Sequence, residues 1–218
     1  MAPVKTSTGN NPYLERAYAL DGKDSTQARA VYDEWALKYD EDVLGSTQGY
    51  VAPGIAAATA AKHLDKPIGS VTILDAGCGT GQVGVKLAAL GAKHISGLDV
   101  SPGMLGVAQK TGAYEHLDTA DLTKQINVKD GTYDVITCVG TLTHGHVGPE
   151  AFAEFVRITK KGGIIVATVI DDIWEEKGFK TEVERLGDAG AVQIIGTQIE
   201  DYRKSVNVTA RMVTLRVL

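Results

Sequence analysis

A glycine-rich loop and three acidic residues are the groups of this chain whose types and spacing are suited to binding a ligand. Asp75 stands just before residues 77–81, in which every second residue is glycine, and Asp99 and Asp121 follow later apolar runs. Because glycine has no Cβ and tolerates positive φ, a ligand can lie directly against the backbone of such a loop. Ionised carboxylates only accept hydrogen bonds. Together these groups predict a site for a ligand with an ammonium group, a ribose diol and an adenine amine.

The same glycines also match a second pattern. Gly79, Gly81 and Gly84 form Gly-x-Gly-x-x-Gly, and Asp99 lies twenty residues after Gly79, as in dinucleotide-binding sites. A carboxylate at Asp75 would repel a pyrophosphate but attract an ammonium group. The chain also shows no second half of a dinucleotide fold. S-adenosylmethionine, which has the amine, ribose and adenine but no phosphate, therefore fits better, and a nicotinamide-dependent reductase is the competing hypothesis.

Alternating strand-like and helix-like segments position these residues. From residue 71 onward, short apolar runs alternate with helical segments, a pattern typical of a parallel sheet covered by helices on both faces. Because parallel strands end at the same edge, the loop, Asp99 and Asp121 are expected to meet there. The last two strand-like runs follow each other directly and are expected to be antiparallel. The predicted strands are 71–74, 94–99, 115–121, 133–139, 164–170, 191–199 and 205–218, and the predicted helices are 82–90, 102–110, 149–159 and 180–186.

The region before residue 69 is expected to cover the sheet. One helix is predicted to begin at Asp24 or Ser25 and to end at Gly45, and a second, Ala-rich helix is predicted over residues 54–65. The first twelve residues are rich in Thr, Ser, Gly, Asn and Pro. The predicted boundaries are 1–12 for a disordered tail, 13–68 for a lid of two helices and 69–218 for the core of one domain.

Two aromatic–acidic pairs mark the first of these helices. Tyr32-Asp33 and Tyr39-Asp40 repeat at an interval of seven residues, so both tyrosines are expected on one helical face. Either the tyrosines pack onto the body of the protein, or the helix is a lid whose Tyr39 reaches the ligand. The same helix is predicted to carry Val31, Trp35, Leu37 and Val43.

Composition limits the class of function. The 218 residues suffice for one domain with a sizeable core, 44% are hydrophobic and the net charge is −5, which argues against a nucleic-acid partner. No apolar run reaches about 18 residues, so no membrane partner is expected and a cytoplasmic location is predicted. Cys78 and Cys138 have neither disulfide nor metal-ligand spacing, so reduced thiols and no metal are expected.

Five segments resemble, in order, the motifs of class I S-adenosylmethionine-dependent methyltransferases. Residues 74–81 (Leu-Asp-Ala-Gly-Cys-Gly-Thr-Gly) resemble the first motif and residues 98–105 (Leu-Asp-Val-Ser-Pro-Gly-Met-Leu) the second. Asp121-Leu122, Tyr133-Asp134-Val135-Ile136 and Lys161-Gly162-Gly163 resemble the next three. The resemblance implies S-adenosyl-L-methionine as the cofactor. It also implies an α/β fold with a Rossmann-like, seven-stranded, mostly parallel sheet of order 3-2-1-4-5-7-6, strand 7 antiparallel.

A closer resemblance extends beyond these motifs. Residues 32–43, with 50–53, are similar to the methyltransferase-like 27 group, also called the Williams–Beuren region 27 type. Residues 140–147 and 174–179 are similar to the same group. The group implies no particular substrate.

Methyl transfer from a sulfonium is an in-line displacement, so the protein mainly aligns the nucleophile and excludes water. The residues after the fourth strand face the methyl group in this fold. Two of them, His144 and His146, are predicted as candidates for a general base, because imidazole titrates near neutral pH. The alternative is that a histidine only lines or caps the loop. The predicted acceptor contacts are Tyr50, Thr143, Trp174 and Tyr202, for which packing is the alternative.

The absence of a large insertion between these motifs points to a small acceptor, methylated on oxygen, sulfur or nitrogen. The alternative is a protein that binds S-adenosylmethionine without methylating, in a pericyclase-like or regulatory role. The resemblance implies cofactor contacts from Tyr39, Asp75, Ala76, Gly77, Cys78, Gly79, Gly81, Asp99, Val100, Ser101, Met104, Asp121, Leu122 and Cys138.

Overall fold

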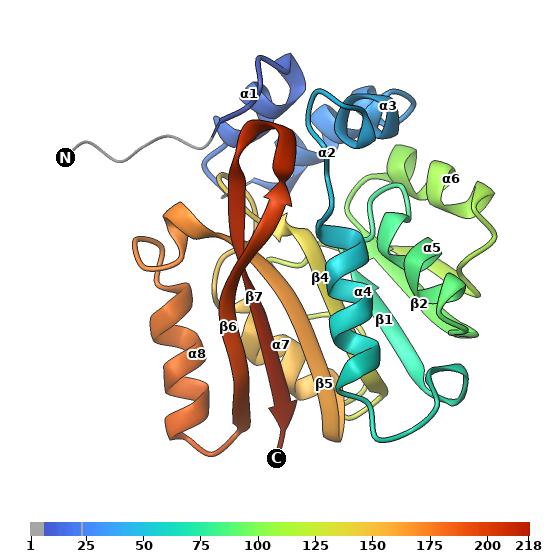
Figure 1. The fold of residues 1–218 in the computed structure, drawn as a ribbon, viewed down its shortest axis with the longest axis vertical. Helices are drawn as coiled ribbons and strands as arrows, with labels where there is room; N and C mark the ends of the chain where they lie inside the picture. The colour runs from blue at the N-terminus through green and yellow to red at the C-terminus, as the bar shows by residue number, and fades with distance from the viewer. Residues whose placement is uncertain (1–6, 23) are drawn as a thin grey trace.

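The computed structural model describes residues 7–22 and 24–218, and its strands form one seven-stranded sheet (Figure 1). The strands are β1 (Thr72–Ala76), β2 (His94–Asp99), β3 (His116–Thr119), β4 (Tyr133–Leu142), β5 (Thr159–Ile170), β6 (Val192–Arg203) and β7 (Val208–Val217). Their order is β3-β2-β1-β4-β5-β7-β6, with β1 to β5 parallel and β7 antiparallel to both neighbours. The predicted sheet is therefore confirmed.

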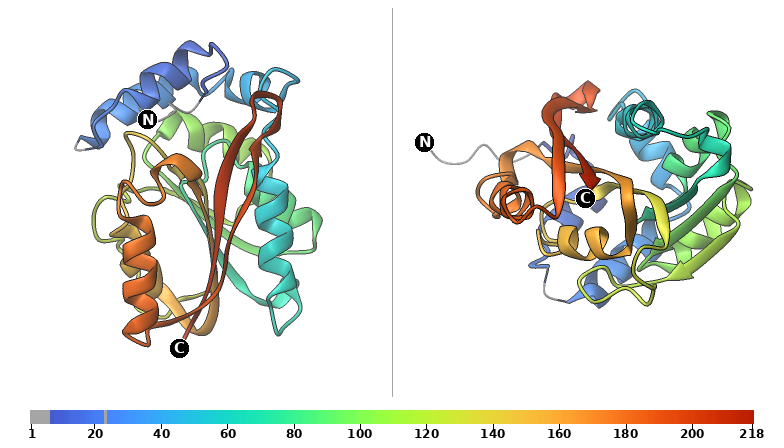
Figure 2. Two further views of the ribbon diagram at one scale, coloured as in Figure 1. Left: turned by 60° about the vertical axis from the view of Figure 1, so that its left-hand side comes forward. Right: turned by 90° about the horizontal axis from the view of Figure 1, so that it is seen from below.

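Helices cover both faces of the sheet (Figure 2). In Figure 1, α4 (Ala52–Lys62) lies in front of the sheet, packed on α5 (Gln82–Ala89), and α7 (Ala151–Ile158) lies behind it. The remaining core helices are α6 (Pro102–Lys110) and α8 (Phe179–Asp188), and 3-10 turns span Ile68–Ser70, Asp171–Ile173 and Lys204–Val206. No helix in the described part of the chain is long and apolar enough to cross a membrane.

The described residues contain four helices before β1, whereas two were predicted. Besides α4, these are α1 (Pro12–Tyr18), α2 (Ser25–Trp35) and α3 (Tyr39–Leu44). α1 was not predicted, because the polar residues 8–11 that precede it were assigned to a tail. Instead Asn11 caps it, its side chain accepting the amide N–H groups of Tyr13 and Leu14 at 3.0 Å. Residues 1–6 of the predicted tail lie outside the described residues.

The predicted helix from Ser25 to Gly45 is broken between Trp35 and Tyr39. The chain turns there, and the exposed fraction of Leu37, which lies in this turn, is 85%. Trp35 is fully buried instead, donating its ring N–H to Asp42 at 2.6 Å and packing edge-on against Tyr39 with 4.6 Å between ring centroids. Tertiary packing around the indole therefore overrides the helical continuation.

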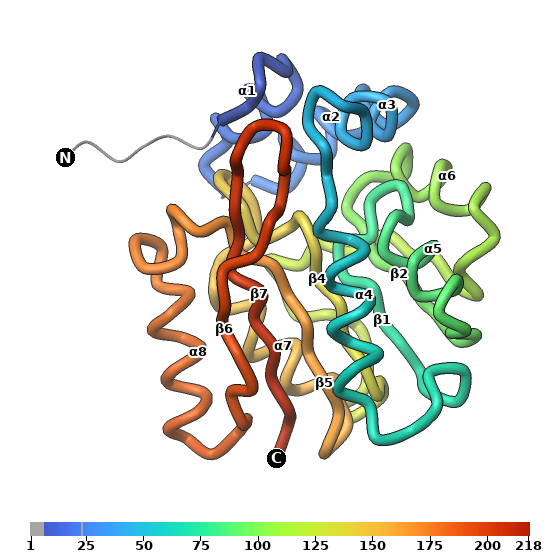
Figure 3. The backbone as a smooth tube through the Cα atoms, in the orientation of Figure 1, coloured from blue at the N-terminus to red at the C-terminus, as the bar shows by residue number. Residues whose placement is uncertain are grey.

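Residues 48–51 add a short antiparallel piece to the edge strand β6. Tyr50 forms a bridge with Arg203, and the Val51 amide donates to the Tyr202 carbonyl at 3.1 Å. The Lys204 amide donates to the Gly49 carbonyl at 3.0 Å. In Figure 3 the tip of the red hairpin accordingly lies beside the blue N-terminal helices. The segment between α3 and α4 is thus hydrogen-bonded to the end of β6.

Candidate active site

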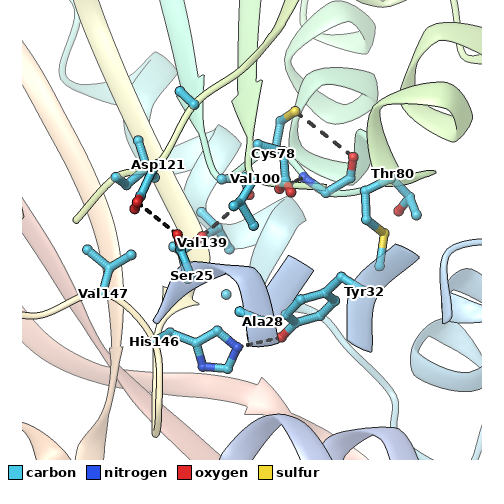
Figure 4. A pocket seen from close by; sticks show the side chains of 18 of the residues that line it. Ser25, Ala28, Tyr32, Cys78, Thr80, Val100, Asp121, Val139, His146 and Val147 are labelled. Atoms are coloured by element: carbon cyan, nitrogen blue, oxygen red, sulfur yellow. Dashed lines mark hydrogen bonds between the residues drawn. The ribbon is translucent and has the colours of Figure 1, made fainter. Parts of the chain in front are cut away.

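A pocket lies at the carboxyl edge of the sheet, between the ends of β1, β2 and β4 and the helices α2 and α3 (Figure 4). Its empty space, which is partly open to solvent, amounts to about 940 Å³. The predicted site residues on its wall are Tyr39, Tyr50, Gly77, Cys78, Gly79, Asp99, Val100, Met104, Asp121, Leu122 and His146. Those that do not line it are Asp75, Ala76, Gly81, Ser101, Cys138, Thr143, His144, Trp174 and Tyr202.

The glycine loop brings bare backbone to this pocket. Gly77, Gly79 and Gly81 have φ of +74°, +54° and +93°, a region that other residues avoid. A Cβ on Gly77 would stand 2.0 Å from the Thr141 hydroxyl oxygen, whereas a Cβ on Gly79 would have no atom within 4 Å. Gly77 therefore allows close packing on β4, and Gly79 keeps the pocket wall flat.

Four amides of the loop, those of Gly77, Cys78, Gly79 and Gly81, are hydrogen-bonded within the protein. Those of Gly77 and Cys78 donate to the Leu98 carbonyl at 2.7 and 2.9 Å, and that of Gly79 donates to a carboxylate oxygen of Asp99 at 2.8 Å. The Gly81 amide donates to the Cys78 carbonyl at 2.9 Å. A pyrophosphate needs free amides at such a loop. The geometry therefore disfavours the dinucleotide hypothesis.

Asp75, expected to meet a ligand ammonium group, is enclosed by protein. It is fully buried and accepts hydrogen bonds from the hydroxyls of Tyr114 at 2.7 Å and Thr137 at 2.9 Å. Burial raises its pKa to about 6, against the opposing effect of the two hydroxyls. The Tyr114 hydroxyl also accepts the Gly84 amide N–H at 3.1 Å. A Cβ on Gly84 would clash with the Tyr114 ring, so this third glycine makes room for a tyrosine rather than a pyrophosphate.

Asp99 lies on the pocket wall at the end of β2. Its two carboxylate oxygens accept the amide N–H groups of Gly79 at 2.8 Å and Ser101 at 2.9 Å. Burial raises its pKa, and the backbone donors act against that rise. Because each carboxylate oxygen has two lone pairs, both can accept a further hydrogen bond from a ligand hydroxyl.

Asp121 lies on the wall just after β3. It accepts the Ser25 hydroxyl of α2 at 2.8 Å, as Figure 4 shows, and forms an ion pair with Lys124 at 2.9 Å. Burial acts to raise its pKa, but hydrogen bonds, chiefly from Thr123, outweigh this and lower the pKa to about 2. Asp121 is therefore an ionised hydrogen-bond acceptor. The apolar side chains of Val100, Met104 and Leu122 complete this part of the wall.

In the two aromatic–acidic pairs, the tyrosines and the aspartates have different roles. Tyr32 and Tyr39 both line the pocket. Asp33 accepts the Ser101 hydroxyl at 2.6 Å, and Asp40 accepts the Thr80 hydroxyl at 2.6 Å. A further donor to each, the Gly103 amide and the Gln82 side chain, lies at 2.8 Å. Asp33 therefore bonds α2 to the loop after β2, and Asp40 bonds α3 to the loop after β1. The repeated Tyr-Asp spacing was the sequence signal for these contacts, but it led to a prediction for the tyrosines only and not for the aspartates.

His146 contacts Tyr32 of α2 at the wall of the pocket. Its Nδ1 lies 2.5 Å from the His144 carbonyl oxygen, which only accepts, so Nδ1 carries the proton. Its Nε2, 2.9 Å from the phenol oxygen of Tyr32, therefore accepts the Tyr32 proton (Figure 4). Burial lowers the pKa of His146 to about 4. The ring is thus neutral, and its basic nitrogen is directed at a pocket tyrosine.

The other candidate side chains point elsewhere. His144 lies outside the pocket, with Nε2 3.0 Å from an Asp172 oxygen. Thr143 contacts His146, with its hydroxyl oxygen 2.9 Å from Nδ1. Cys138 is fully buried, which raises its pKa, and Trp174 belongs to the main core. No group of three His, Cys, Asp or Glu among residues 7–22 and 24–218 is arranged to hold a metal ion.

Comparison with known proteins identifies the family. A family model described as a methyltransferase domain matches residues 74–167. Human methyltransferase-like protein 27 is 36% identical over 171 residues, covering 77% of this chain and 69% of that protein. The chain belongs to the S-adenosylmethionine-dependent methyltransferases, in the methyltransferase-like 27 group. S-adenosylmethionine is the cofactor of this family, as the motifs implied. Three further relatives, all named O-methyltransferases, are matched over 38–44% of their own length.

Solved structures share the fold. Magnesium protoporphyrin IX methyltransferase from Synechocystis PCC 6803, solved with bound S-adenosylhomocysteine, has a TM-score of 0.66 at 19% identity, over 89% of this methyltransferase and all of that chain. The [4+2]-cyclase SpnF has a TM-score of 0.66 at 18% identity, over 91% of this chain and 98% of its own. At these identities the likeness is one of fold.

Proposed function

We propose that this methyltransferase transfers the methyl group of S-adenosylmethionine to an oxygen, sulfur or nitrogen atom of a small molecule. The supporting observation is a single pocket with two different walls. The glycine loop, Asp99 and Asp121 form one wall. Tyr32, Tyr50 and His146 lie on the other, beneath α2 and α3. Because these helices cover the pocket, only an acceptor that fits beneath them reaches the first wall.

The wall residues fit the cofactor. We assign Asp99 to the ribose hydroxyls and Asp121 to the adenine amino group, with Val100, Met104 and Leu122 enclosing the ring, because ionised carboxylates accept from both groups. When bound, S-adenosylmethionine supplies a methyl group on a positively charged sulfur. A lone pair of the acceptor bonds to the methyl carbon in line with the carbon–sulfur bond, which breaks and leaves its electron pair on the sulfur.

We assign His146 to proton removal, acting through Tyr32. The acceptor donates its proton to the Tyr32 oxygen while the Tyr32 proton passes to Nε2 of His146, 2.9 Å away. His146 is held in the neutral form that this step needs, because burial lowers its pKa. Bonding to the methyl carbon makes the acceptor proton more acidic, so a weak base is sufficient.

Two measurements test this function. Calorimetry with S-adenosylmethionine is expected to show binding, and no binding to the folded protein would contradict the proposal. Release of S-adenosylhomocysteine is then followed across phenols, thiols, amines and carboxylic acids. The alternative of a non-methylating role, suggested by the shared fold of SpnF, predicts cofactor binding without release for any acceptor. A fluorescence titration with a nicotinamide dinucleotide is expected to show no binding.

A further inference from the structure

A smaller chamber adjoins the main pocket on the side away from the glycine loop. The two cavities share the walls formed by Tyr32, Tyr39, Tyr50 and Gly140. Tyr18, Tyr202 and Arg203 are on the walls of the smaller chamber alone. Five tyrosines therefore surround a space whose one strongly charged wall residue is an arginine.

Arg203 is buried without a carboxylate partner among the described residues. Its exposed fraction is 2%. Its Nη1 donates to the Gln48 side-chain oxygen at 2.8 Å, and its Nη2 donates to the Ser7 carbonyl at 2.7 Å and the Tyr18 hydroxyl at 3.2 Å. All three acceptors are neutral, and Nε has no hydrogen-bond partner. A guanidinium has five N–H donors, so Nε–H and one Nη1–H are left for a ligand.

Two aromatic rings and a backbone contact hold this guanidinium in place. Its central carbon lies 5.7 Å from the ring centroid of Tyr18 and 6.0 Å from that of Tyr202. The bridge between Tyr50 and Arg203 fixes the backbone. Burial raises the pKa of both Tyr18 and Tyr202, so neither ring supplies a negative charge. Because a buried charge is costly unless it is paired, this arrangement favours the binding of an anion.

The position of Arg203 in the sheet favours the acceptor over the cofactor as the source of that anion. Asp99 ends β2 and Asp121 follows β3, on one side of β4. Arg203 ends β6, on the opposite side, with β5 and β7 between. The ends of β4 and of residues 48–51 lie between the two regions, and both cavities share Tyr50 and Gly140 there.

We propose that the chamber binds a carboxylate of the acceptor against Arg203, so that the substrates of this methyltransferase are small organic acids. This inference rests on the proposed function, since it names the class of acceptor for the same site. The acid group occupies the aromatic chamber, and the rest of the molecule passes Tyr50 and Gly140, bringing its nucleophilic atom to the main pocket. Planar, charge-assisted hydrogen bonds to carboxylates are the interaction for which arginine is best suited.

Matched acids and amides test the proposal on the unmodified full-length protein. Benzoate and benzamide, which have nearly the same shape, are titrated by calorimetry at saturating S-adenosylhomocysteine, together with phenylacetate and phenylacetamide. Turnover is compared for hydroxybenzoates and their amides. We expect the acids to be favoured by about 10- to 100-fold, the range for a hydrogen bond to a charged group. Equal binding of acids and amides, or no binding of either, would overturn the proposal.

Two variants assign the preference to the guanidinium. Arg203→Met is expected to reduce the preference for acids to less than about twofold, and Arg203→Lys, which keeps a positive charge but not the Nε–H donor, to leave part of it. Arg216→Met is the control, because Arg216 lies at the opposite end of the same hairpin, bonded to Asp65. The comparison on the unmodified protein decides the matter even where Arg203→Met does not fold.

Cofactor affinity separates this proposal from the proposed function. Binding of S-adenosylmethionine to Arg203→Met is expected to stay within about threefold of the unmodified protein. A loss of cofactor affinity with an unchanged preference for acids would place Arg203 in the cofactor site and reject the chamber. Methylation of neutral acceptors as fast as of acids would reject the chamber while leaving the methyltransferase function intact.

Discussion

The phenol oxygen of Tyr32 lies 2.9 Å from Nε2 of His146, and this contact joins α2 to the loop after β4. Both side chains line the same pocket. Tyr32 of α2 is therefore the proton donor of this pair, and His146, in the loop after β4, is the acceptor.

Removing the basic nitrogen is expected to slow turnover far more than it weakens cofactor binding. His146→Gln should lower kcat for hydroxyl acceptors by about 100-fold, the usual contribution of general-base catalysis, and Tyr32→Phe by a comparable factor. The affinity for S-adenosylmethionine, measured by calorimetry, should change less than about threefold. His94→Gln, on exposed His94 beside Glu115, is the control. Unchanged turnover in His146→Gln would remove His146 from the mechanism.

Two glycines allow backbone strain to be separated from contact with the ligand. Gly79 and Gly112 have φ of +54° and +69°, and a Cβ at either would have no atom within 4 Å. Gly79→Ala and Gly112→Ala should therefore lose similar stability, about 1–2 kcal/mol each in urea unfolding. Only Gly79 lines the pocket, so only Gly79→Ala should weaken binding of S-adenosylmethionine, by about 10-fold or more. Equal affinity in both variants would mean that the cofactor does not lie on this loop.

His146 should make the protein less stable at acidic pH. Its folded pKa is about 4 against an unfolded value near 6.5. The unfolded state therefore binds the proton first, and stability is lost as the pH falls from about 6.5 to 4, by at most about 3 kcal/mol. The free energy of unfolding of His146→Gln, measured over this range, should fall less steeply than that of the unmodified protein. Parallel curves would contradict the assignment.

Tyr114→Phe should destabilise the protein by about 1–3 kcal/mol, because it removes a donor to buried Asp75 and an acceptor for the Gly84 amide. The folded pKa of Asp75 is raised to about 6 from 3.8, so ionisation already costs stability as the pH rises through this range. Losing the donor should raise that pKa further. The destabilisation should therefore be larger at pH 8 than at pH 4, measured by urea unfolding. Tyr133→Phe, at the start of β4, is the control, and a pH-independent loss would contradict this account.

Removing the carboxylates of Asp33 and Asp40 should loosen the contact of α2 and α3 with the loops at the sheet edge. Asp33→Ala combined with Asp40→Ala removes the bonds to Ser101 and Thr80, so the exposed turn between α2 and α3 should become a better protease substrate. Trypsin cleavage after Lys38, followed by mass spectrometry, should be about 10-fold faster, and S-adenosylmethionine should protect less. Glu41→Ala, on exposed Glu41 of α3, is the control. Equal cleavage rates would show that these carboxylates do not hold α2 and α3 in place.

The sheet was predictable because local signals and the global order agree. The range of β2 matches its predicted range, and Ser101 caps α6, with Pro102 in its first turn, as its position in the sequence suggests. Asp99 and Asp121 were found because parallel strands deliver their ends to one edge. These features depend on residues close together in the chain.

The surroundings of a side chain are hardest to predict where its partners are distant in sequence. Asp75 was expected to contact a ligand, but Tyr114, 39 residues later, occupies it. His144 and His146 looked equivalent, until Asp172 and Tyr32 gave them different surroundings. The surroundings of Arg203 are likewise set by residues distant in sequence. Its burial depends on Ser7, Tyr18 and Gln48, far earlier in the chain, and no spacing pattern encodes such contacts.

The pairing of residues 48–51 with β6 affects the order in which the fold assembles during synthesis. Tyr50 and Arg203 are more than 150 residues apart, and β6 reaches the sheet only through β7, which follows it along the chain. Closing so long a loop is slow, so β1 to β3 with the glycine loop can assemble well before this contact forms. A nascent chain arrested before Val208 therefore has the wall assigned to the methyl donor but no finished compartment for its recipient.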